Sequence, residues 1–224
     1  MIRRLRQAVA TFVVLTLLII SFIGIMKLKD YSDFKKILSN LNAESRIAEV
    51  LVTGSRLDEI TGDFITTIKF LEFDVNDQPL RPKYFTFHGN KIQFQSLVIR
   101  FKDDYVEQGH RLKGKSIYLF LKAFVLSDKG TQVFDISRPK AIPEGYKVRG
   151  VNNRLQNRIW ARFWKYALTP TGREQVEIKN AQLEAPGSVF VPGTIYTIKI
   201  EHDGGMRIDT APIPEVLRGE LIRP

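Results

Sequence analysis

The sequence predicts a mainly β, antiparallel, sandwich-like fold, with an amino-terminal transmembrane helix and one amphipathic helix in the soluble domain. Three observations predict it: an uncharged apolar run near the amino terminus, alternating β-branched and aromatic residues through most of the chain, and one later segment of helical periodicity. In chain order we expect a short basic tail (1–7), the apolar helix (8–26), a juxtamembrane helix or stalk (27–46), the β-rich domain (47–211) and an extended tail (212–224).

The apolar run from Ala8 to Met26 has the length of a membrane-spanning helix. Its nineteen residues carry no charge, and at 1.5 Å per residue they match a bilayer hydrocarbon core of ~30 Å. The run ends without the small-x-small site of a cleavable signal peptide, and the chain has no cysteine to carry a lipid. A buried core helix fits poorly, because every face is apolar and basic residues flank both ends. The sequence therefore predicts a retained signal anchor that crosses the membrane once.

The orientation of this anchor is less strongly indicated. The positive charges at its two ends nearly balance, with Arg3, Arg4 and Arg6 before it and Lys27, Lys29, Lys35 and Lys36 after it. A short arginine-rich tail before a first apolar helix is the usual signal-anchor arrangement. We therefore expect a plasma (inner) membrane protein with a cytoplasmic amino terminus and an extracytoplasmic carboxy-terminal domain.

After the anchor, apolar residues at spacings of three and four predict a helix that continues out of the membrane. They include Tyr31, Phe34, Leu38 and Leu41. One interpretation is an oligomerisation stalk that joins identical chains, although the pattern covers two heptads where a coiled coil needs three or four. The other is a helix that packs its apolar stripe on its own β domain. A homo-oligomer is thus one of two open interpretations.

The middle of the chain has the alternation of antiparallel strands. The segment 64–75 (FITTIKFLEFDV) is apolar on both faces, which predicts a strand covered on both sides. Gly89 and Asn90 lie between two alternating runs and are typical of a two-residue hairpin. The segments 96–101 and 116–126 add two further strands, and turn signals separate them.

The segment at about 152–168 predicts the amphipathic helix of the domain. Asn152 or Asn153 caps its start, and Pro170 with Gly172 marks its end. Its apolar stripe consists of Leu155, Ile159, Phe163 and Tyr166, widened by Trp160 and Trp164. Its basic strip consists of Arg154, Arg158, Arg162 and Lys165, which fall within about 80° of arc at 100° per residue.

Two interpretations of this helix stay open. In the first, the basic strip, together with Trp160 and Trp164, contacts a protein partner or an anionic lipid surface. In the second, the aromatic side packs on a sheet and the basic side is solvated. The segment from Ile136 to Arg173 contains nine basic residues and one acid, Glu144. It is the densest charge imbalance outside the anchor, although the net charge of the whole chain is +10.

The stretch that begins at Phe190 (FVPGTIYTIKI) carries one further motif. It resembles the Leu-x-Pro-Gly-Thr-x-Tyr corner of fibronectin type III domains, with Phe190 at the leucine position and Pro192, Gly193, Thr194 and Tyr196 matching. In that fold the tyrosine hydrogen-bonds back to nearby backbone at a corner of the sandwich, so the resemblance implies this role for Tyr196. The match covers seven residues and favours a two-sheet sandwich over an open sheet.

No catalytic, metal or cofactor motif occurs in the sequence. The three histidines, His88, His110 and His202, are too scattered to share a metal, and we expect all three at the surface. The chain lacks a nucleophile elbow, a phosphate-binding glycine loop and a His-Glu-x-x-His helix. We therefore expect no catalytic residue, no metal and no cofactor.

The expected function is a membrane-anchored, non-catalytic structural or interaction subunit of a cell-envelope (periplasmic) protein assembly. Its expected partners are the membrane and the other proteins of that assembly. Two alternatives stay open: an envelope enzyme of unrecognised type, and a cytoplasm-facing domain that binds anionic lipid or nucleic acid. Nucleic acid is the least favoured partner, because acidic and basic residues are interspersed over most of the domain.

Overall fold

The computed structural model describes residue 7 and residues 11–25, 48–59, 62–74, 77–101, 116–127, 130–148, 150–169, 178–200 and 205–217. Residues 11–25 are helical, and the β domain begins at Ala48. Among these described residues, no helix combines the length and the apolar content that crossing a membrane requires. The predicted stalk residues Tyr31, Phe34, Leu38 and Leu41 lie outside the described residues.

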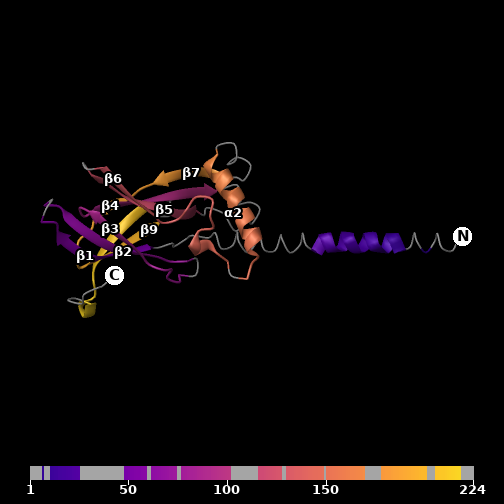
Figure 1. Ribbon diagram of the computed structural model, residues 1–224, viewed down its shortest axis with the longest axis horizontal. Helices are drawn as coiled ribbons and strands as arrows, with labels where there is room; N and C mark the ends of the chain where they lie inside the picture. Colours follow the sequence, from indigo (N-terminus) through magenta and orange to yellow (C-terminus); the bar gives the residue numbers. More distant parts are fainter. Residues whose placement is uncertain are drawn as a thin grey trace.

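The β domain consists of two antiparallel sheets, and one long helix, α2, lies on the second of them (Figure 1). The first sheet has the strand order β10-β9-β1-β2-β3, and the second has the order β6-β5-β4-β7 with β8 also paired to β4. The strands are β1 (Ala48–Leu57), β2 (Phe64–Glu72), β3 (Lys83–His88), β4 (Lys91–Phe101), β5 (Ser116–Ser127), β6 (Gly130–Asp135), β7 (Ile178–Glu184), β8 (Gly187–Val189), β9 (Thr194–Ile200) and β10 (Met206–Pro212). The helical elements of the domain are η2 (Glu144–Tyr146), α2 (Asn153–Leu168) and η3 (Glu215–Leu217). The prediction of a mainly β, antiparallel fold is confirmed.

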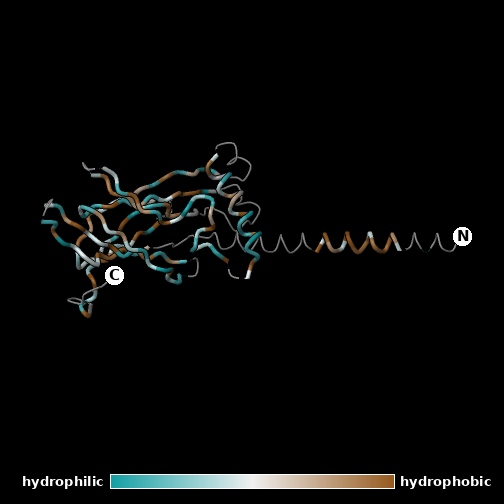
Figure 2. Tube along the Cα trace, in the orientation of Figure 1, coloured by the Kyte–Doolittle hydropathy of each residue, from teal (hydrophilic) through white to brown (hydrophobic). Residues whose placement is uncertain are grey.

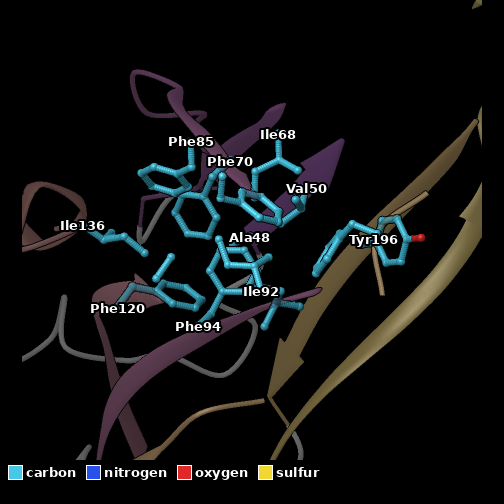
Figure 3. Close-up of a cluster of buried hydrophobic side chains, with 14 of the residues drawn as sticks. Ala48, Val50, Ile68, Phe70, Phe85, Ile92, Phe94, Phe120, Ile136 and Tyr196 are labelled. Carbon is cyan, nitrogen blue, oxygen red and sulfur yellow. The ribbon is translucent and has the colours of Figure 1, made fainter. Parts of the chain in front are cut away.

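The main core lies between the two sheets (Figure 3). Alternate side chains of the first sheet, among them Val50, Ile68 and Phe70, face Phe94 and Phe120 of the second. The Phe70 ring stacks on Phe94 and meets Phe120 edge-on, with both pairs of ring centroids 5.3 Å apart. Each such pair contributes about 0.5–1.5 kcal/mol beyond its buried area. Aromatic contacts across the gap therefore hold the sheets together.

A bulge in the second sheet keeps this core continuous. Gln95 of β4 pairs with Lys122 of β5, and the next residue, Ser96, pairs with Phe120, so Leu121 is an extra residue without a partner position in β4. An extra residue reverses the alternation of the strand that carries it. Phe120 and Ala123 therefore both face the inter-sheet core, although an unbroken strand would turn them to opposite faces.

The prediction that 64–75 forms a strand covered on both sides is wrong. In β2, buried Ile68 and Phe70 alternate with Ile65, Lys69 and Leu71, which are only half-buried. The second face of β2 is an outer face of the sandwich. Its apolar residues are mixed with polar ones there, so the strand has one core face.

The predicted hairpin at Gly89 and Asn90 is also wrong. β3 pairs with β2 and β4 pairs with β5, so the turn carries the chain from one sheet to the other. The Gly89 N–H donates to the carbonyl of Phe64 in the first sheet (2.6 Å), whereas the carbonyl of Asn90 accepts from Phe190 N–H beside the second (2.7 Å). The positive φ of Gly89 (88°) suits a sharp corner as well as a hairpin, which is why the two were indistinguishable in the sequence.

Tyr196 forms the corner that the fibronectin type III resemblance implies. The chain passes from β8 in the second sheet to β9 in the first, and Tyr196 is buried beneath this crossing. Its hydroxyl donates to the carbonyl of Val189 (3.0 Å) and accepts from the N–H of Val191 (2.8 Å). Its ring packs against Phe190, with centroids 4.3 Å apart. One side chain thus holds both the backbone and the apolar packing of the crossing.

We predict that Tyr196→Phe destabilises the domain by about 1–2 kcal/mol, because it removes one acceptor and one donor from the crossing backbone and keeps the ring. Denaturant unfolding followed by tryptophan fluorescence measures the change. Tyr84→Phe is the matched control, since Tyr84 is exposed on β3, and it should change the free energy of unfolding by less than ~0.5 kcal/mol. If the two substitutions changed the free energy of unfolding equally, the hydrogen bonds of the Tyr196 hydroxyl would contribute nothing to the stability of the domain.

Candidate functional site

Helix α2 lies on a second buried surface of the second sheet, on the face away from the first sheet. Consecutive residues of β4 serve both surfaces: Val98 packs toward the first sheet, whereas Leu97 and Ile99 pack toward α2. Leu119 of β5 and Ala181 of β7 complete the platform under the helix. A strand that is apolar on both faces needs cover on both, and α2 supplies the second cover.

Two tryptophans fix α2 to this platform. Trp160 and Trp164 are each 1 % exposed, and the Phe163 ring lies edge-on to Trp160 with centroids 4.9 Å apart. The indole N–H of Trp164 donates to the carbonyl of Ala141 (2.8 Å), which ties the helix to the segment before it. The prediction that Trp160 and Trp164 contact a partner or lipid is therefore wrong, because both side chains are buried in the core beneath the helix.

A buried glutamine sets the rotation of α2, and sequence reasoning missed it. Gln156 is fully buried. Its side-chain amide accepts from Val148 N–H (3.0 Å) and donates to the carbonyls of Val148 (2.9 Å) and Val151 (3.1 Å). Gln156, Trp160 and Trp164 follow one another at intervals of four, so the spacing placed this glutamine on the buried side. The polarity of the residue hid that signal.

The start of the helix is fixed by its cap and by a neighbouring tyrosine. The side chain of Asn152 accepts from Arg154 N–H (2.8 Å), as expected for an N-cap. Tyr146, in the 3₁₀ turn before the helix, donates its hydroxyl to the carbonyl of Tyr118 in β5 (3.0 Å). The preceding segment and the helix are therefore one unit seated on the sheet.

The outward face of α2 is basic. Arg154, Arg158 and Lys165 are exposed, and Asn157 and Ala161 lie between them on the same face. The helix contains no acidic residue. Within the described part of the chain these three side chains form no ion pair. The backbone of Arg162 belongs to the same helix, and its side chain lies outside the described residues. The structure thus separates the predicted set into a buried aromatic side and an exposed basic side.

Basic residues on the first sheet are arranged differently. On its outer face, Lys199 of β9 and Arg207 of β10 converge on Asp209, at N–O distances of 2.9 and 3.0 Å. The hydrogen bond from Lys199 lowers the pKa of Asp209 below its usual value of 3.8, desolvation opposes the shift, and the charges of Arg207 and Lys199 add to it. These two cations are neutralised locally, in contrast to the basic residues of α2.

The described residues offer little that could bind a metal. No group of three or more histidine, cysteine, aspartate or glutamate side chains among them is arranged as a metal site. His88 is exposed at the end of β3. His110 and His202 lie outside the described residues. The basic face of α2 is therefore the candidate site that the geometry supports best.

Comparison with known proteins does not identify a relative of this chain. The chain matches no known protein family, no curated protein and no solved structure. The resemblance to fibronectin type III domains therefore concerns the corner at Tyr196 and names no family.

We predict that Gln156→Leu destabilises the domain by about 3 kcal/mol, because it leaves the part-buried N–H and carbonyl of Val148 and the buried carbonyl of Val151 without their side-chain partner. Asn157→Leu changes the adjacent exposed residue and should stay within ~0.5 kcal/mol of the native protein. Denaturant unfolding measures both variants. If the two variants unfolded at the same denaturant concentration, Gln156 would have no part in seating the helix.

We also predict that the carboxyl of Asp209 titrates below pH 3.8 in the folded protein. Because the folded pKa is the lower one, the ion pairs stabilise the fold fully above pH 3.8 and lose this effect as the pH falls through the folded pKa. An NMR titration of the Asp209 side chain measures the value. Lys199→Met should raise it toward 3.8, and Arg207→Met should raise it by less, because the Lys199 hydrogen bond is the largest cause.

Proposed function

We propose that this protein is a single-pass, membrane-anchored, non-catalytic interaction subunit of a cell-envelope assembly, and that the basic face of α2 is its contact surface. The observation that carries the proposal is the exposure of the amino-terminal helix. The large apolar side chains between Phe12 and Ile25 are 49 % to 70 % exposed. Figure 2 shows that this helix is apolar along its length.

This exposure has a direct physical consequence. Apolar surface in water costs roughly 25 cal/mol per Å², and the surface here surrounds the helix on all sides. A helix that is apolar all round needs apolar surroundings all round, which a bilayer supplies. The uncharged run from Ala8 to Met26 is long enough for this role. We therefore assign it as the anchor.

The arginines before this run support the orientation. Arg3, Arg4 and Arg6 lie directly before the anchor, as in signal anchors that keep the amino terminus in the cytoplasm. The β domain then works outside the cytoplasm, in the envelope. An interaction role follows from α2, whose exposed cations have a fixed orientation and are not neutralised by acids in the same helix.

Fractionation of the full chain tests the anchor. The protein should remain in native membranes after alkaline carbonate and should need detergent for release, and its amino terminus should precede Met26. Leu17→Asp with Ile20→Asp should release it, because an acid at the centre of a span costs about 2.5–3.5 kcal/mol. Leu126→Asp with Val133→Asp is the matched control on exposed apolar residues of β5 and β6, and this variant should stay in the membrane.

Two results would contradict the proposal. One is a mature amino terminus after Met26, since the anchor would then have been removed. The other concerns orientation: protease added to spheroplasts should digest the β domain, and protection until the membrane is permeabilised would place that domain in the cytoplasm.

A further inference from the structure

We infer that the basic face of α2 docks on the anionic lipid headgroups of the membrane that holds the anchor, with the helix lying along the membrane surface. This inference rests on the proposed anchor and names the partner of the same surface. It is carried by three features: the end of the domain at which the chain enters, the position of α2 at that end, and the fixed outward direction of its cations.

The chain enters the β domain at Ala48. This residue pairs with Ile198 of β9, and two positions further along β9 lies Ile200, paired with Met206 at the start of β10. Ile200 and Met206 pack against Val98 and Tyr118 of the second sheet. The part of the second sheet around Val98 and Tyr118 therefore lies at the same end of the sandwich as Ala48, where the chain enters.

That half of the second sheet is the one covered by α2. Leu97, Ile99 and Leu119, which form the platform of the helix, are sequence neighbours of Val98 and Tyr118 and point to the opposite face. Figure 1 shows α2 running across this end of the sandwich, at a steep angle to the strands. A domain tethered through Ala48 to a membrane therefore presents α2 on its membrane-proximal end.

The tether keeps this end close to the membrane. Residues 26–47 join the amino-terminal helix to β1, and whatever their conformation they span at most about 80 Å. A short tether raises the effective concentration of the two surfaces to the millimolar range. A modest attraction is then enough to hold the docked state.

The attraction is electrostatic and has a fixed direction. Trp160, Trp164 and Gln156 set the rotation of α2, so Arg154 and Arg158 cannot turn toward the core. An arginine or lysine near an anionic membrane surface contributes a roughly five-fold preference for the bound state. Of the acids described at this end, Asp74 and Asp77 lie in the β2–β3 connection of the first sheet, and Glu144 is exposed in η2, before the start of α2.

Anionic lipid fits this surface better than an acidic protein does. On the exposed face of α2, Asn157 and Ala161 lie between the cations, and the one large apolar side chain exposed there among the described residues is Leu168, at the end of the helix rather than at its centre. A stable protein interface needs a buried apolar or aromatic anchor at its centre. The aromatic residues of α2 that would supply one are already buried against the sheet.

The test uses the full chain reconstituted in lipid nanodiscs, first of phosphatidylcholine alone and then of an equimolar mixture with phosphatidylglycerol. Because the chain has no cysteine, Asn157→Cys allows one fluorophore to be placed on the exposed face of α2. Ser55→Cys, exposed at the opposite end of β1, is the control position. Energy transfer to an acceptor on the lipid headgroups reports the distance of each position from the membrane.

We expect phosphatidylglycerol to raise the transfer from position 157 and to leave position 55 unchanged. High salt should reverse the rise, because the screening length falls from ~10 Å at 0.1 M to ~3 Å at 1 M. Arg154→Gln with Arg158→Gln should lower the ratio of docked to free domain about 25-fold. Arg56→Gln with Lys91→Gln removes two exposed cations from the end of the sandwich opposite Ala48, and it should leave the ratio of docked to free domain unchanged.

Three outcomes would overturn the inference. The first is equal transfer from position 157 in the two lipid compositions. The second is an equal fall in the ratio of docked to free domain for the Arg56→Gln, Lys91→Gln variant, since docking would then not depend on the position of the basic residues. The third is an acidic protein that copurifies in detergent through Arg154 and Arg158 with no effect of phosphatidylglycerol. In each case the carbonate extraction of native membranes, described above, shows separately whether the anchor, and with it the proposed function, still stands.

Discussion

The double burial of the second sheet is the constraint on which the rest of the structure depends. Leu97, Val98 and Ile99 are consecutive, so one of them must face away from the other two, and all three are buried. The first sheet covers one face of β4, and only an added element can cover the other. Each large side chain left in water would cost about 1.5–3 kcal/mol. Helix α2 is in place because this second face has to be covered.

The basic surface follows from that packing. Because Trp160 and Trp164 pack against the second sheet, the opposite side of α2 faces solvent, and its residues need only be compatible with water. The sequence places cations there without acids. Had the helix merely required a solvated face, mixed charges would have served, as they do around Asp209 on the first sheet. The contrast between the two surfaces is the reason to treat α2 as a site.

The crossings between the sheets are the other determinant of the fold. The chain passes from the first sheet to the second at Gly89 and back from the second to the first near Tyr196. The two crossings lie side by side, since the carbonyl of Asn90 accepts from Phe190 N–H. Tyr196 secures the second crossing with a hydroxyl that serves two backbone groups. A sandwich built this way depends on a few polar contacts at its corners as much as on its aromatic core.

The sequence by itself determined the local features of this protein. The helix near 152–168, the alternation of the strands and the corner role of Tyr196 could be predicted because each depends on neighbours within a few positions, through helical spacing, period-two alternation or a short motif. Only the tertiary structure decided which strands share a sheet, that Gly89 and Asn90 turn between sheets, that β4 rather than β2 is buried on both faces, and that Trp160 and Trp164 pack on the second sheet. These outcomes depend on contacts between residues far apart in the chain, and the free energy of burying a face is set by the element that covers it, which local periodicity does not specify.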